Sequence, residues 1–206
     1  MRRWRLIAAR RLSTALTLTA AMVAGCSEPT RDPNESLIPT QPAAVKPSGT
    51  VEERIKAAEE AAAQKDYAKA IKPLEDAILI DAKDRRVLAL LARYGAAHAR
   101  DIAKTDPGQA YKQIVSAGVY LRMLQREHPD ATPEEKQLLL DVLYDEAAAH
   151  AKSMRMEETL GALREAVGAG FRDFDKIRGD ADWKEMLEYP EFKKEFDEIA
   201  KTQKPS

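Results

Sequence analysis

From Val51 onward the apolar side chains recur with the period of an α-helix, and this pattern constrains the fold more than any other feature of the chain. One such stripe consists of Tyr67, Ala70, Ile71, Leu74, Ala77 and Ile78. Glycine is sparse, and no run alternates apolar and polar residues as a half-buried strand does. The sequence therefore predicts an all-α fold.

Helix start and stop signals divide this region into six predicted helices separated by short turns. The first two helices are expected to start at Val51 and Tyr67, and the third after its cap Asp84. The fourth is expected to start at Pro107 after Asp106, the fifth at the capping box Thr132-Pro133-Glu134-Glu135, and the sixth near Met156. Gly168 and Gly170 are expected to end the last of them. Short turns between consecutive helices predict antiparallel hairpins that stack on one another.

The segment DYAKAIKPLEDAILIDAKD at 66–84 resembles the second half of a tetratricopeptide repeat (TPR). In that 34-residue family, small residues let paired helices approach and bulky residues fill the gap between them. Ala70 and Ala77 stand at the small positions, and Tyr67, Ile71 and Leu74 stand at the bulky ones. The resemblance implies a short TPR-like solenoid, with a first repeat that begins at Val51.

Later segments repeat the pattern with departures. A second unit begins at Arg85 and needs longer helices, which predicts a long middle hairpin over about 84–128. The third unit, around Tyr144, has Thr159 at a position where alanine is usual and Met154 at the turn glycine. Residues 170–196 resemble the segment that closes such arrays, with apolar cover from Trp183, Leu187 and Phe192. The predicted repeat domain is 51–202, and Pro73 inside its second helix predicts a bend there.

The first 25 residues have the anatomy of an export signal, with five arginines followed by an uncharged run that is short for a membrane span. They end in Val23-Ala24-Gly25-Cys26, which resembles the lipobox of bacterial lipoproteins. The resemblance implies cleavage between Gly25 and Cys26 and a lipid on the sulfur of Cys26, the single cysteine of the chain. Ser27, where an Asp would indicate inner-membrane retention, favours the outer membrane, facing the periplasm, if the cell is Gram-negative.

Residues 26–50 comprise Cys26 and a proline-rich stretch with few large apolar side chains. Such a segment cannot bury enough surface to offset its ordering entropy, so we expect a disordered tether. At about 3.1 Å per residue it reaches roughly 70 Å from the membrane.

The charge balance argues against nucleic acid as a partner. Removal of the five signal arginines changes 33 basic and 34 acidic side chains to 28 and 34, a net charge of about −6. Binding to phosphates needs a basic face. The expected partners are the membrane, through the lipid anchor, and an envelope protein or peptide.

No catalytic, metal or cofactor motif emerges from the sequence, and no small-molecule substrate is expected. His98, His128 and His150 lie outside any metal-ligand spacing, and the paired acids Glu52-Glu53 and Glu59-Glu60 are typical of solvated helix faces. Four aspartates at 173–182 invite comparison with a calcium loop, but counted from Asp173 the fifth position is Ile177, the glycine falls at the seventh position, and the final position is Lys184 in place of Glu. They are better explained as helix caps.

In TPR proteins the first helix of each pair lines a concave face that binds extended peptides or partner helices. The resemblance places on that face Glu52, Glu59, Arg86, Arg93, Asp141, Tyr144 and Lys152. Arg86 and Arg93 could hold an acidic segment, although salt bridges to Glu52 and Glu59 are favoured over it. We expect a membrane-anchored interaction module or scaffold. The alternatives are a structural subunit that packs through the middle hairpin and, with least support, an envelope hydrolase or its accessory subunit.

Overall fold

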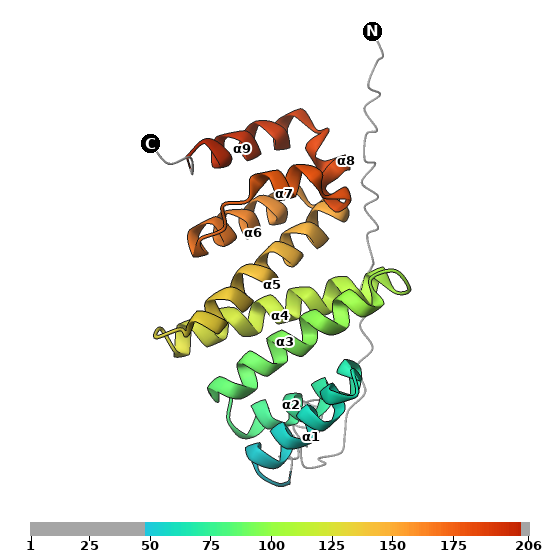
Figure 1. The fold of residues 1–206 in the computed structure, drawn as a ribbon, viewed down its shortest axis with the longest axis vertical. Coiled ribbons are helices and arrows are strands. Elements are labelled where there is room, and N and C mark those ends of the chain that lie inside the picture. Colours follow the sequence, from blue (N-terminus) through green and yellow to red (C-terminus); the bar gives the residue numbers. More distant parts are fainter. Residues whose placement is uncertain (1–47, 203–206) are drawn as a thin grey trace, which may run out of the picture. The chain divides into compact units, whose positions relative to one another are not determined.

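The computed structural model describes residues 48–202, and every regular element in that range is helical (Figure 1). In chain order the elements are α1 (Val51–Ala63), α2 (Tyr67–Ile80), α3 (Arg85–Ile102), α4 (Pro107–Glu127), α5 (Pro133–Lys152), α6 (Met156–Ala169), α7 (Phe174–Gly179), the 3-10 turn η1 (Ala181–Trp183), α8 (Lys184–Leu187) and α9 (Pro190–Lys201). The all-α prediction is confirmed over this range. Cys26 and most of the expected tether lie outside the described residues.

Side-chain caps set most of the helix starts. Asp84 and Asp106 accept backbone N–H groups at the starts of α3 and α4, as the sequence predicts. Thr132 and Glu135 form the expected capping box of α5. A second capping box, made by Thr50 and Glu53, begins α1 and was not anticipated. Because each cap satisfies N–H groups that the helix leaves open, these boundaries follow from local sequence.

Helices pack most closely within three consecutive pairs, α1 with α2, α3 with α4, and α5 with α6. The turns of the first and third pairs share one geometry. Lys65 and Met154 both have positive φ, 60° and 55°. The next residue in each case, Asp66 or Arg155, donates its N–H to a carbonyl five residues back, at 3.1 and 3.0 Å. The middle pair is longer and turns differently, in line with the long hairpin expected over about 84–128.

The core consists of successive clusters, and each cluster joins neighbouring pairs. Ala58, Ala70 and Ala77 are completely buried where α1, α2 and α3 meet, because a small side chain lets the helices approach. Helix α3 belongs to two clusters. Its Val87 packs toward α1 and α2, while its Leu88 packs toward α4 and α5. Each pair therefore depends on its neighbour for part of its buried surface.

Aromatic side chains concentrate in the last cluster. Trp183, Phe192 and Phe196 are fully buried against α5 and α6. Covering of the last hairpin by Trp183 and Phe192 was expected from the sequence. Because aromatic rings each bury a large apolar area, this end of the described chain holds its bulkiest packing.

Two residues that depart from the repeat pattern are accommodated differently. Thr159 is completely buried, and its hydroxyl donates a 2.6 Å hydrogen bond to the carbonyl of Arg155, so the extra polar group is satisfied. Pro73 lies half-buried inside α2. The bend expected at Pro73 stays a prediction.

Candidate functional site

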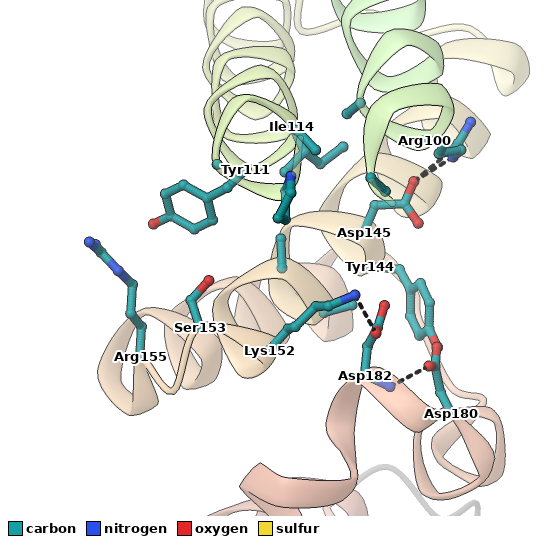
Figure 2. A pocket seen from close by; sticks show the side chains of 17 residues that line it. Arg100, Tyr111, Ile114, Tyr144, Asp145, Lys152, Ser153, Arg155, Asp180 and Asp182 are labelled. Carbon is teal, nitrogen blue, oxygen red and sulfur yellow. Dashed lines mark hydrogen bonds and ion pairs between the residues drawn. The ribbon is translucent and has the colours of Figure 1, made fainter. Parts of the chain in front are cut away.

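A groove of about 720 Å³ lies between the end of the α3–α4 hairpin and the C-terminal half of α5. It exists because α5 packs on the hairpin near the end of α4 and then runs away from it (Figure 1). The turn after α5 and the η1 segment close the remaining sides (Figure 2). A concave site of this size is within the range of known ligand pockets.

Small residues line much of the groove. The alanines among its lining residues are Ala99, Ala103, Ala110, Ala148 and Ala149, and they come from α3, its C-terminal cap, α4 and α5. Ile114 adds one larger apolar side chain, and Gly108 stands at the first turn of α4. Because these residues carry little or no side chain, they leave room for a partner's side chain.

Two ion pairs stand among the lining residues. Arg100 contacts a single oxygen of Asp145 through two nitrogens, at 2.6 and 2.8 Å, and joins α3 to α5. Lys152 at the end of α5 lies 2.9 Å from Asp182 of η1. Figure 2 shows both pairs, with Arg155 and Tyr111 on the opposite side of the groove from Arg100. Lys152 and Asp182 are each about half exposed, so their pair is open to exchange with charged groups of a ligand, whereas Asp145 beside Arg100 is only 27% exposed.

Two tyrosines are held by polar neighbours. Tyr144 donates a 2.5 Å hydrogen bond to Asp180, which itself caps η1. The Tyr111 hydroxyl shares a 3.2 Å hydrogen bond with Nδ1 of His150, and the guanidinium of Arg155 lies 5.2 Å from the Tyr111 ring centre. These contacts fix both rings, so this part of the groove is preorganised.

Burial shapes the titration of two lining residues. It raises the pKa of Asp145 above the ordinary carboxyl value, although Arg100 acts in the opposite direction. It also raises the pKa of Tyr144, and the hydrogen bond to Asp180 raises it further. Asp145 therefore pays a desolvation cost when ionised that Arg100 does not fully offset.

A polar cluster joins α4, α5 and α6, with Glu146 buried and Arg122 and Glu165 each about a third exposed. Arg122 of α4 donates to Glu146 of α5 at 3.0 Å and to Glu165 of α6 at 2.6 Å. Glu146 is only 4% exposed, and its other neighbour is His150, 3.8 Å away. Gly118 faces this cluster so closely that a β-carbon there would lie within 3 Å of the Glu146 and Arg122 side chains. The cluster ties three helices together by charge as well as by packing.

The structure brings together only some of the residues expected on the concave face. Tyr144 and Lys152 line the groove. Tyr144 is 7% exposed and belongs to the core, so it forms part of the groove wall and is not an open contact residue as expected. Arg86 forms a 2.7 Å ion pair with Glu52, one of the two salt bridges that the sequence favoured, but the other, between Arg93 and Glu59, is not formed.

The remaining expected residues do not line the groove. Glu59, Arg93 and Asp141 are exposed, and Asp141 accepts a hydrogen bond from Gln137 of the same helix. The lining residues that sequence analysis missed come mostly from the end of α3, the first half of α4 and the second half of α5. The seven-residue spacing of Arg86, Arg93 and Arg100 was visible in the sequence, but the divergence of α5 from α4 had no sequence signal.

The other polar clusters have structural roles in the described residues. Asp173 and Asp180 cap α7 and η1, in keeping with the interpretation of the late aspartates as caps. His128 bonds the carbonyl of Lys83 at 2.7 Å and ties two turns together. Within residues 48–202 no three His, Cys, Asp or Glu side chains are grouped as metal ligands. Gly25 and Cys26 lie outside the described part of the chain.

Comparisons with models of known families, with curated proteins and with solved structures find no match. In the part of the chain from 48 to 202, no helix combines the length and apolar character that a bilayer span requires.

Proposed function

We propose that this chain is a lipid-anchored, TPR-like interaction module of the bacterial cell envelope, and that a protein partner docks in the groove between the α3–α4 turn and α5. The observation that carries the proposal is the groove itself, with its small lining residues and the exposed ion pair between Lys152 and Asp182. An apolar side chain from a partner fits against alanines, while polar groups at the edge give direction and specificity.

The TPR-like part of the proposal is supported by the correspondence between α1–α2 and α5–α6. Lys65 and Met154 make the same left-handed turn. Counted from those turns, Ala77 and Ala166 occupy matching buried positions, which is the small-residue pattern that the family uses to bring helices together. Core clusters shared between adjacent pairs are also what a stack of repeats requires.

The anchoring part rests on the sequence around Cys26. A basic head, an apolar run and Val23-Ala24-Gly25-Cys26 coincide there, and the following residues supply a tether of roughly 70 Å at about 3.1 Å per residue. Several acyl chains on one cysteine hold a protein far better than a single chain. The folded part would work near a membrane surface, with the outer membrane facing the periplasm as the favoured site.

A second candidate function is packing of the α3–α4 hairpin within an envelope assembly. The observation that favours it is Val119, which is 47% exposed near the middle of α4. One exposed valine supports a contact less strongly than a formed groove, so the docking function is preferred.

The groove is tested by filling it. Gly108 is exposed, and a β-carbon there meets only Asp106 at 3.7 Å, so Gly108→Trp places an indole at the groove without displacing the core. A photo-crosslinking residue at Ser153, which is exposed and also lines the groove, should capture an envelope partner in cells. We expect Gly108→Trp to remove that adduct.

The matched control is Gly161→Trp, at an exposed helical glycine of α6 with no atom within 4 Å of the added β-carbon. It should leave the adduct at the wild-type level. An adduct of equal intensity in both variants would show that the groove is not the docking site.

The anchor is tested separately. Cys26→Ala removes the sulfur that would carry the lipid, so the protein should move from the membrane fraction to the soluble fraction on cell fractionation. Cys26→Ala that remains with the membranes would contradict lipid anchoring through this residue.

A further inference from the structure

One face of α3 carries a row of arginines at seven-residue intervals, Arg86, Arg93 and Arg100. Seven residues make almost two helical turns, so the three side chains leave the helix on the same side. At 1.5 Å of rise per residue they are spaced by about 10.5 Å. Arg100 also lines the groove, so the row runs toward it.

The ends of the row are paired and its centre is not. Arg86 bonds Glu52 of α1, and Arg100 bonds Asp145 of α5. Arg93 is exposed, and of the arginines at 48–202 it alone makes neither an ion pair nor a hydrogen bond. Even Arg172, which contacts no carboxylate, donates to two backbone carbonyls. The centre of this face therefore holds an uncompensated cation.

The surface between the arginines leaves space for a main chain. Ala89 lies between the first two arginines and Ala97 between the last two, and both are half-buried. The ion pair of Arg86 is no obstacle, because the side chains of Arg86 and Glu52 are 57% and 70% exposed. Arg100 is 54% exposed but its partner Asp145 is only 27% exposed, so Arg100 adds positive charge to the row while it keeps its own pair. Exposed pairs contribute roughly 0–1 kcal/mol, so a competing carboxylate can replace one at small cost.

We infer that this row binds an extended acidic segment of the docked partner, with one carboxylate held by Arg93. The inference rests on the proposed docking function and names the chemistry of the partner. A polyproline II chain advances about 3.1 Å per residue with three residues per turn, so carboxylates at every third position lie on one side of the chain, about 9.3 Å apart, close to the spacing of the arginines. A guanidinium takes a carboxylate with two parallel hydrogen bonds, which makes Arg93 the anchor.

The net negative charge of the protein repels an acidic partner at long range. The chain after Cys26 has a net charge of about −6, so contact at the row, and not long-range steering, must supply the affinity. Binding should weaken as salt rises, because the contacts are exposed.

The test is fluorescence anisotropy with the detergent-solubilised full chain and labelled peptide probes. The acidic probe is four repeats of Glu-Ser-Pro, in which proline keeps the chain extended. The comparison probes are four repeats of Lys-Ser-Pro, and a peptide of the same composition as the acidic probe with its glutamates adjacent. We expect the acidic repeat probe to bind most tightly. Arg93→Gln should weaken it by about fivefold or more, the effect of losing one charge-assisted contact.

The control is Arg126→Gln in α4, which removes another exposed arginine whose partner is its neighbour Glu127. It should change the affinity for the acidic repeat probe by less than about twofold. Equal binding of the acidic and lysine repeat probes, or no effect of Arg93→Gln, would overturn the inference. Binding that appears only after deletion of residues 27–47 would also overturn it, because the chain's own tether would then be the occupant.

The crosslinking assay separates this inference from the proposed function. If Gly108→Trp removes the Ser153 adduct and Arg93→Gln leaves it intact, docking in the groove stands and the acidic segment is rejected. If both variants remove it while Gly161→Trp does not, both are supported.

Discussion

At the scale of single residues, Gly118 shows how one missing side chain permits a charge cluster around a buried carboxylate. Gly118 lies in α4 among the buried residues of that helix. The structure shows that the space beside it holds Glu146 and Arg122. Because Glu146 is almost completely buried, its carboxylate depends on this guanidinium for compensation.

We expect Gly118→Ala to destabilise the protein even though alanine favours helix by about 1 kcal/mol. The added β-carbon would overlap a Glu146 oxygen and lie 2.7 Å from an Arg122 nitrogen. Arg122 can move toward solvent, but Glu146 is only 4% exposed, so its carboxylate has little room to shift. Overpacking of this kind costs about 1–3 kcal/mol, which exceeds the gain in helix propensity. Urea unfolding monitored by circular dichroism measures the difference.

Gly161→Ala is the paired control, because an added β-carbon there meets no atom within 4 Å. It should raise the free energy of unfolding by up to about 1 kcal/mol. An increase of similar size in Gly118→Ala would mean that the cluster adapts freely.

At the scale of helices, local chemistry determined most of what could be predicted. Asp84, Asp106 and Thr132 predict helix starts, because each side chain accepts a hydrogen bond from a backbone N–H only two or three residues later. The angle at which α5 leaves α4 depends instead on many contacts between residues distant in the chain. The groove follows from that angle, so Tyr144 and Lys152 could be proposed as contact residues without any sign of the groove that they line.

Contacts between helix starts make the stability depend on pH. Arg85 at the start of α3 donates two 2.7 Å hydrogen bonds to Glu135 at the start of α5 and also contacts Asp130. The bond from Arg85 lowers the pKa of Glu135, and it likewise lowers the pKa of Asp130. A carboxyl whose pKa is lower in the folded state stabilises the fold above its unfolded pKa and loses that contribution as pH falls through the folded value.

We therefore expect the free energy of unfolding to fall as the pH drops below about 4.3, the ordinary glutamate pKa. Arg85→Gln should make that decline shallower, because without Arg85 the pKa values of Glu135 and Asp130 in the folded protein lie closer to their unfolded values. Urea unfolding at intervals between about pH 5 and pH 3 tests this. Arg93→Gln, which removes an arginine without an ion pair, should keep the wild-type slope.

At the scale of the whole described region, stability is distributed along a stack. The α1–α2 pair shares one core cluster with α3, whereas α5 and α6 are covered on their far side by Trp183 and Phe192. In such an arrangement each pair is stabilised mainly by its own contacts and by its nearest neighbours. The order of the pairs could be inferred from the sequence, but the difference in how much apolar surface covers each end of the stack became visible only in the structure.

Hydrogen exchange should reveal this locality. Leu74→Ala and Phe192→Ala each empty a fully buried position, at a cost of about 2–5 kcal/mol. Leu74→Ala should accelerate exchange in α1, α2 and the start of α3, while Phe192→Ala should act on α5 to α9. Equal acceleration along all helices in both variants would show that the region opens as one unit.

The composition of the groove wall has a consequence for how the protein is made. Its lining runs from Ala99 to Asp182, so its first and last contributors are separated by most of the folded sequence. A ribosome delivers these residues in order, and a nascent chain that has reached α5 still lacks the η1 aspartates that hold Tyr144 and Lys152. The complete groove therefore forms only after residues up to Asp182 have been added, and a shorter nascent chain lacks part of the surface at which docking is proposed.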